Sequence, residues 1–264
     1  KITYVIDAAM KEAGLTYDDI DKIAVTAEPG LIGSLMVGIN AAKTIGLAYH
    51  KPVIMVNHIY GHIYANYLES DFSFPLIALV VSGGHTELVY MKDHYDFKVL
   101  GETLDDAVGE AYDKVARVVE VGYPGGPILD KMAALGKPTY KLPHIKLAKD
   151  SYDFSFSGLK SAEIHNKCKE RNETLNYNDL ACSFQEAVID VLVSKTIMAA
   201  KEFNAKQVLI AGGVAANKGL RSKMKEEMDK IGVKLTVPSI KNCTDNAAMI
   251  GVAGYFQDLK ANKL

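Results

Sequence analysis

Two apolar runs that each end in a glycine pair constrain the fold of this chain more than any other feature. Residues 76–81 are all apolar, Ser82-Gly83-Gly84 interrupts them, and alternation resumes over residues 86–91. This pattern predicts a β-hairpin whose glycines expose backbone N–H groups, which can donate to phosphate oxygens. Residues 208–211 lead in the same way into Gly212-Gly213 and a helix predicted over residues 218–230, an arrangement typical of an anion or nucleotide site.

A third glycine break lies at residues 123–127, which read Tyr-Pro-Gly-Gly-Pro. Glycine lets a ligand approach the backbone where a side chain would obstruct it. A single Gly-Gly pair is more often an ordinary turn. Because three such breaks occur in one chain, we predict that together they form a nucleotide cradle.

His58 and His62 stand four residues apart on a helix predicted over residues 58–69, directly after a strand predicted over residues 52–57. Side chains so spaced are neighbours on a helix and can share one metal ion. The zincin peptidase motif needs a Glu after its first His, and Ile59 stands there, so a peptidase would lack its general base. Ordinary surface or core histidines remain the alternative to a metal pair.

Composition excludes several classes of protein. The chain has 264 residues and 48% hydrophobic content, enough for one large or two modest domains. The formal charge is −2 and the pI is near 6.4, so the net charge of the protein does not attract it to nucleic acid or to anionic membranes. No apolar stretch approaches the roughly 18 residues of a membrane span, so no membrane association is predicted.

Local charge and cysteine usage add two further expectations. The best basic cluster predicts either an RNA contact or a solvated face; it comprises Lys137, Lys141, Lys146 and Lys149. The three cysteines are widely spaced and odd in number, which favours buried thiols in a reducing compartment and a cytoplasmic location; they are Cys168, Cys182 and Cys243.

The order of strand and helix patterns predicts an α/β protein of two lobes with a nucleotide between them. The first lobe is predicted over residues 1–73, completed by part of a helix at residues 247–264. The second lobe is predicted over residues 74–246. A helix rich in small residues, from residue 33 to residue 48, permits close approach of another helix, either at a surface or inside its own lobe.

Seven motifs in order along the chain resemble the bacterial TsaD family of tRNA threonylcarbamoyltransferases, formerly called O-sialoglycoprotein endopeptidases. They are His58-x-x-x-His62 and the segments at residues 80–86, 109–114, 123–126, 153–160, 212–217 and 243–249. The resemblance implies an actin-like, sugar-kinase-type (ASKHA) fold. It also implies transfer of a threonylcarbamoyl group from threonylcarbamoyl-AMP to N6 of the adenosine beside the anticodon (t6A37) in tRNAs that read ANN codons.

The resemblance also implies site residues and partners. It assigns a metal to His58, His62 and Asp245, a set suited to Fe²⁺, one per subunit, or to Zn²⁺. It implies a TsaB-type paralogue and a TsaE-type ATPase as partners, and it assigns no catalytic base. The substrate-binding residues that it implies are Val81, Ser82, Gly83, Gly84, His85, Asp113, Gly126, Asp130 and Asn217.

Two of these residues have simpler interpretations from the sequence alone. Asp245 can complement the dipole of a following helix, and Asp113 can pair with Arg117 one helical turn away. Family members also open with a phosphate-loop strand and carry an H-x-G-G-V-x-P-E segment. Neither is present here, so a first lobe truncated at its N-terminus is expected. The alternatives in function are a non-catalytic actin-like subunit and an ATP-dependent carbamoyltransferase of the same fold.

Overall fold

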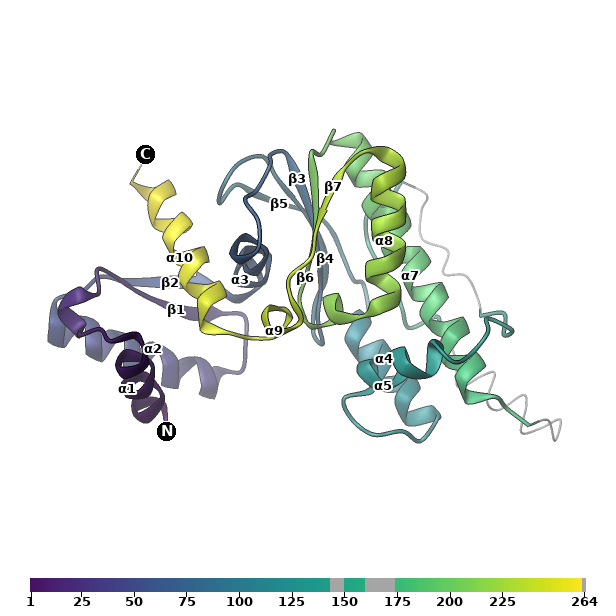
Figure 1. Cartoon of the computed structure of the whole chain (residues 1–264), viewed down its shortest axis with the longest axis horizontal. Coiled ribbons are helices and arrows are strands. Elements are labelled where there is room, and N and C mark those ends of the chain that lie inside the picture. The colour runs from purple at the N-terminus through teal and green to yellow at the C-terminus, as the bar shows by residue number, and fades with distance from the viewer. Residues whose placement is uncertain (143–149, 160–173, 263–264) are drawn as a thin grey trace.

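The computed structural model describes residues 1–142, 150–159 and 174–262. Lys146 and Lys149 of the basic cluster, Lys160 of one motif, and Cys168 lie outside these residues. The described chain forms two sheets (Figure 1). The smaller sheet pairs β1 (Ile23–Glu28) with β2 (Val53–Asn57) in parallel.

The larger sheet has five strands in the order β5-β4-β3-β6-β7. Strand β3 pairs antiparallel with β4 and parallel with β6, so the predicted glycine hairpin is confirmed. Every residue of β3 and β6 is buried, which explains why both read as unbroken apolar runs. The strands are β3 (Leu76–Val81), β4 (Thr86–Met91), β5 (Phe97–Glu102), β6 (Gln207–Ala211) and β7 (Lys234–Thr236).

Successive side chains of β3 point to opposite faces of this sheet, and both sets are apolar. Helices therefore cover both faces. Ile77, Leu79 and Val81 belong to one hydrophobic core, and the intervening residues belong to another. The first core is covered by α4 (Val108–Val118), α5 (Gly125–Ala133), α7 (Tyr177–Glu202) and α8 (Lys218–Ile231), on the right in Figure 1. The second is covered by α3 (His58–Ala65) and α10 (Ala247–Ala261).

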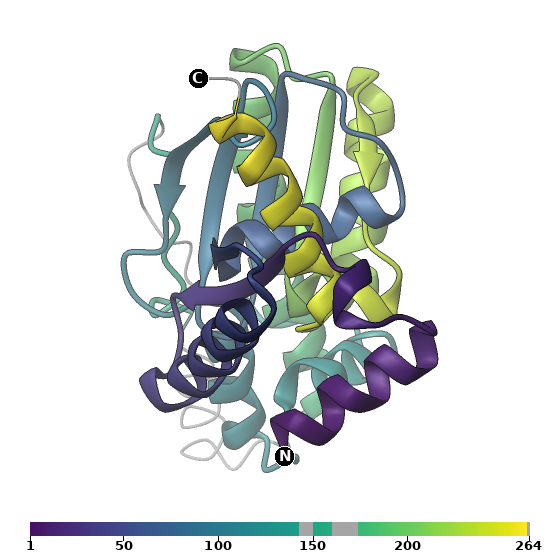
Figure 2. The same ribbon diagram turned by 90° about the vertical axis from the view of Figure 1, so that its left-hand side faces the viewer.

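Helices α3 and α10 therefore lie between the two sheets. Their close approach depends on glycine, since a Cβ on Gly61 would lie 2.6 Å from Ile250 Cδ1. A Cβ on Gly254 would likewise lie 2.8 Å from Ala24 Cβ of the smaller sheet. Figure 2 shows α10 running across the front of the larger sheet, with the amino-terminal helices nearest the viewer. These are α1 (Ile2–Ala13) and α2 (Ile32–Tyr49).

The predicted α/β class is confirmed, with small differences at element ends. The helix expected over residues 58–69 ends at Ala65 and continues as a 3₁₀ turn, Asn66–Leu68. The last helix begins at Ala247 because the Asn246 side chain accepts the Met249 N–H and caps it. The division between residues 73 and 74 stays a prediction. Within the described residues, no helix has the length and apolarity needed to cross a membrane.

Candidate metal centre and substrate cleft

The two histidines owe their common orientation to the start of α3. Asn57 ends β2, and its side-chain oxygen accepts the N–H groups of Ile59 (2.8 Å) and Tyr60 (3.3 Å), so the helix begins at His58. Ile59 faces the core between the sheets. His58 and His62 then lie one turn apart, with ring centroids separated by 4.7 Å.

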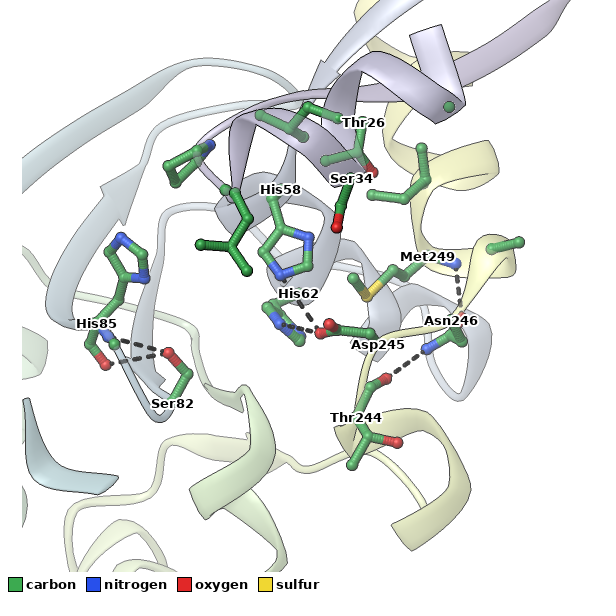
Figure 3. A pocket seen from close by; sticks show the side chains of 18 of the residues that line it. Thr26, Ser34, His58, His62, Ser82, His85, Thr244, Asp245, Asn246 and Met249 are labelled. Atoms are coloured by element: carbon green, nitrogen blue, oxygen red, sulfur yellow. Dashed lines mark hydrogen bonds and ion pairs between the residues drawn. The ribbon is translucent and has the colours of Figure 1, made fainter. Parts of the chain in front are cut away.

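Asp245 reaches this pair from the segment that precedes α10. One of its carboxylate oxygens lies 3.3 Å from Nε2 of His58 and 3.3 Å from Nε2 of His62. Figure 3 shows both rings directed at that carboxylate. The ligand atoms of the three residues lie within 4.8 Å of one another, so the structure brings the predicted triad together.

The electrostatics of the triad suit a divalent metal. Burial, and then the neighbouring His58, lower the pKa of His62 to about 4, although Asp245 opposes the shift. The ring of His62 is therefore neutral near pH 7, the form that can ligate a metal. Two imidazoles and one carboxylate form a donor set that Fe²⁺ and Zn²⁺ both accept. The residues present thus fit the metal that the motif implies.

A cleft of about 1060 Å³ surrounds the triad. It is lined on one side by the loop from β1 to α2, including Pro29 and Gly30, and on the other by Ser82–His85 and Gly213. Two of the three glycine breaks therefore face the same space as the candidate metal ligands. The volume suits a small-molecule site, for which about 300–1,000 Å³ is typical.

The turn of the β3–β4 hairpin is closed by its own hydrogen bonds. Ser82 N–H donates to the His85 carbonyl at 2.8 Å, and His85 N–H donates to Ser82 Oγ at 3.0 Å. A Cβ built on Gly83 or Gly84 meets no atom of the described residues within 4 Å, so the backbone here is open to a ligand. Val81, by contrast, is fully buried and its side chain belongs to the core beneath α4 and α7.

Sequence reasoning missed the support behind this turn. Gly109, in the first turn of α4, donates its N–H to the Ser82 carbonyl at 3.2 Å. Thr86 Oγ1 accepts the N–H of Val108 at 2.9 Å. A Cβ on Gly109 would lie only 2.7 Å from the Cα of Gly83, so glycine is required for this approach. The signal available in the sequence was Gly109 itself, because glycine is an unfavourable residue inside a helix.

The third glycine break is not among the residues that line this cleft, so its part in the expected nucleotide cradle stays a prediction. Gly125 begins α5, where its N–H donates to Asp113 Oδ1 at 2.8 Å. A Cβ on Gly125 would lie 2.4 Å from Ala116 Cβ. This glycine permits the packing of α5 on α4, whereas a Cβ on Gly126 would meet none of the described atoms within 4 Å.

Asp130 and Asn217 belong to a hydrogen-bonded network beside α7. Asn217 is buried, caps α8 through the Leu220 N–H (2.8 Å) and donates to Gln185 Oε1 (2.7 Å). Gln185 Nε2 donates in turn to Asp130 Oδ1 at 3.1 Å. Asp130 borders a second cavity of about 590 Å³. The predicted substrate residues are thus divided between the cleft and this network.

Ser155 and Ser157, from the motif at residues 153–160, bind the loop that precedes α4. Both hydroxyls donate to the carboxylate of Asp105, which also accepts the Phe156 N–H at 2.8 Å. These hydrogen bonds hold the segment 155–157 against the loop that precedes α4.

Fold and site together define an α/β protein of the actin-like, sugar-kinase type with a candidate metal centre. The full-length HypF structure in its phosphate- and nucleotide-bound form matches with a TM-score of 0.75 at 15% identity. That match covers 98% of this chain and 50% of the HypF chain, so this chain spans about half its length. Component A of the Acidaminococcus fermentans (R)-2-hydroxyglutaryl-CoA dehydratase matches with a TM-score of 0.51 at 15% identity, covering 96% and 82%. At these identities the likeness concerns the fold alone.

The sequence comparison identifies the family. The model of the TsaD family, tRNA N6-adenosine threonylcarbamoyltransferase, matches residues 1–252. A relative of that name from Staphylococcus saprophyticus is 57% identical over 258 residues, which are 97% of this chain and 75% of the relative. One from Staphylococcus epidermidis is also 57% identical, over 97% of this chain and 76% of the relative. The chain belongs to the tRNA N6-adenosine threonylcarbamoyltransferase family.

Proposed function

We propose that this chain transfers the threonylcarbamoyl group of threonylcarbamoyl-AMP to N6 of adenosine 37 in tRNAs that read ANN codons. The observation that carries the proposal is the convergence of His58, His62 and Asp245 in one cleft with the open Gly83-Gly84 turn. Membership of the family gives the reaction class, an acyl transfer to tRNA. We place the reaction in the cytoplasm, in keeping with the cysteine pattern.

The metal that we propose at the triad is Fe²⁺, one ion per chain, with Zn²⁺ as the alternative. When bound, it supplies a Lewis acid that polarises a carbonyl or holds a carboxylate of the substrate. His62 is buried, whereas Asp245 is exposed to the cleft. The side of the triad that none of the described residues covers therefore faces the cleft. A substrate oxygen can therefore approach from the cleft without displacing a protein ligand.

We propose that the adenylate is held by the two regions described above. The backbone N–H groups of Gly83 and Gly84, with Ser82 and His85, hold the phosphate, and Val81 contributes through its backbone. Asp113, Gly126, Asp130 and Asn217 hold the nucleoside part. The network around Asn217 must then exchange some of its internal hydrogen bonds for bonds to the ligand.

The chemical step needs orientation more than a strong base. The N6 amine attacks the carbamoyl carbon, the bond from that carbon to the phosphate oxygen breaks, AMP leaves, and the N6 proton passes to solvent. Because the mixed anhydride is already activated, fixing the amine in line with the carbonyl supplies much of the rate. Donors aimed at the developing oxyanion supply the rest. We assign no residue as general base.

We further propose that the enzyme works with a TsaB-type paralogue and a TsaE-type ATPase. The helix of small residues, α2, is mostly exposed, and its buried residues are Ala42 and Gly46. Large apolar side chains project from this region to solvent, namely Leu31, Ile32, Met36 and Leu47. Among the described residues, this apolar exposure supports α2 as a surface that receives a partner. For tRNA we retain Lys137 and Lys141 as the described part of the basic cluster.

The test measures incorporation of radiolabelled threonine into ANN-reading tRNA from preformed threonylcarbamoyl-AMP. The purified protein is tested alone and with the two partners. We expect multi-turnover modification with the partners, and its absence in the Asp245→Ala variant. A non-catalytic subunit would give no modification under any condition. An ATP-dependent carbamoyltransferase of the same fold would consume ATP in the presence of its own substrate while leaving tRNA unmodified.

A further inference from the structure

Asp245 is the member of the triad whose position has the least local support. Its side chain is 78% exposed, whereas that of His62 is 4% exposed. The described contacts of its carboxylate are to the two histidines themselves. The placement of Asp245 therefore depends on whatever fixes the backbone segment from Pro238 to Asn246.

Arg221 on α8 holds that segment from one side. Its Nε donates to the Ala215 carbonyl at 2.6 Å, and its Nη2 donates to the Pro238 carbonyl at 2.7 Å. Nη2 also lies 3.1 Å from the sulfur of Cys243, two residues before Asp245. One guanidinium thus joins the 3₁₀ turn Gly213–Ala216, which borders the cleft, to the short helix α9 (Ile240–Cys243).

Glu69 holds the same segment from the opposite side. It follows the 3₁₀ turn that continues the histidine helix α3. Its Oε1 accepts the Ser239 N–H at 3.2 Å and the Asn242 Nδ2 at 2.7 Å. The element that carries both histidines is therefore bonded directly to the element that leads to Asp245.

Support of this kind matters because the usual support is missing at His62. A metal-ligating histidine almost always donates its second ring nitrogen to a neighbouring acceptor, which fixes the ring. Nδ1 of His62 is buried and has no hydrogen-bond partner among the described residues. The ring is held by packing, so the distance between its Nε2 and Asp245 is set by how α3 and α9 are joined.

We propose that Arg221 and Glu69 are positioning residues for the metal centre: they clamp the Pro238–Asn246 segment between α8 and the histidine helix, and so hold Asp245 within ligand distance of His58 and His62. This inference rests on the proposed metal site. It assigns neither residue a contact with substrate or metal.

The test titrates Co²⁺ into the metal-free full chain and follows the visible absorption bands, which report the number and geometry of ligands. Glu69→Ala and Arg221→Met are expected to weaken Co²⁺ affinity about 10- to 100-fold. Their spectra are expected to shift toward that of Asp245→Ala. Glu69→Gln keeps an acceptor oxygen and is expected to bind within about twofold of the unsubstituted protein. Arg221→Lys keeps the charge but loses the fork of donors and is expected to stay weak.

Lys225→Met, on the exposed face of the same helix α8, is the matched control and is expected to leave affinity and spectrum unchanged. Amide hydrogen exchange of residues 239–246 in the metal-free protein gives a second readout. It is expected to accelerate about tenfold in Glu69→Ala and to recover in Glu69→Gln. If Arg221→Met fails to fold, the two Glu69 variants decide the question.

If His58→Ala abolishes Co²⁺ binding but Glu69→Ala leaves the affinity and the spectrum unchanged, the clamp is wrong and the metal site stands. Unchanged binding in His58→Ala would instead overturn the metal site on which the clamp depends. The two failures are therefore distinguishable in one titration series.

Discussion

The cleft around the triad and the network around Asn217 differ in how their polar groups are satisfied. In the cleft, Gly83 and Gly84 face open space, Asp245 is mostly exposed, and Nδ1 of His62 has no hydrogen-bond partner in the part of the chain that the structure describes. In the network, Asn217 and Gln185 bond to each other and to their neighbours. Groups left open can serve a ligand at little cost to the fold, whereas groups already paired serve the fold first. Substitutions in the two regions should separate binding from stability.

The largest effect is expected at the triad. His58→Ala and Asp245→Ala remove a metal ligand each, and both should abolish tRNA modification and lower bound metal to background. Because Asp245 is exposed and His58 is partly exposed, the melting temperature of the metal-free protein should change little. Elemental analysis measures the bound metal, and thermal unfolding measures the melting temperature. Stoichiometric metal in a His58→Ala/His62→Ala double variant would contradict the assignment.

The next effect compares two glycines that look alike in the sequence. Gly84→Val places a branched side chain in open space at the cleft, so nucleotide binding should be lost while stability is retained. Gly125→Ala forces a Cβ to within 2.4 Å of Ala116 Cβ, so it should cost roughly 1–3 kcal/mol of unfolding free energy.

Calorimetric titration with the adenylate and urea unfolding of both variants test this contrast. Normal affinity in Gly84→Val would mean that the hairpin turn is only a turn. Full stability in Gly125→Ala would show that α4 and α5 can separate without penalty.

Asn217→Ala should affect both properties at once. It removes the cap of α8 and the shorter of the two described hydrogen bonds to Gln185 Oε1, which keeps the Tyr112 hydroxyl as a donor. Together these losses predict a decrease of roughly 1–3 kcal/mol in unfolding free energy and weaker binding of the adenylate. Asn217→Asp keeps the cap oxygen but removes the amide donor, so it separates the cap from the bonds that the amide donates to Gln185 and Tyr112. If Asn217→Asp binds and unfolds as the unsubstituted protein does, those bonds contribute nothing measurable.

A further effect, comparable in size but spread over several pH units, is a pH dependence of stability from His62. Its folded-state pKa of about 4 lies below the ordinary value of 6.5, so the unfolded chain takes up the proton first as pH falls. The free energy of unfolding of the metal-free protein is therefore full above pH 6.5. It should fall between pH 6.5 and about 4, by on the order of 2 kcal/mol. Urea unfolding at pH 7 and pH 5 measures this, and His62→Gln should flatten the difference.

The histidine pair and the glycine hairpin could be predicted from the sequence, because each depends only on residues that are close along the chain. The pairing of His58 with His62 follows from the helical period, and Asn57 fixes where that period starts. The Gly83-Gly84 hairpin follows from an apolar run broken between two strands. The Gly125 break carries the same local signal, yet it packs two helices together, because only the neighbouring helix distinguishes a packing glycine from a binding one.

What the sequence by itself determined is therefore the set of elements and the residues within one turn of each other: strands, caps, the histidine pair and the open hairpin. The resemblance to a family pointed to Asp245, which local rules would have assigned to the dipole of α10. Only the tertiary structure decided that Asp245 meets both histidines, that Asp130 and Asn217 lie in a separate network, and that Arg221 and Glu69 clamp the segment between them. The physical reason is that hydrogen bonds between distant segments depend on how helices pack on the sheet. The period of a helix or strand shows which of its faces is buried, but not which distant residues that face meets.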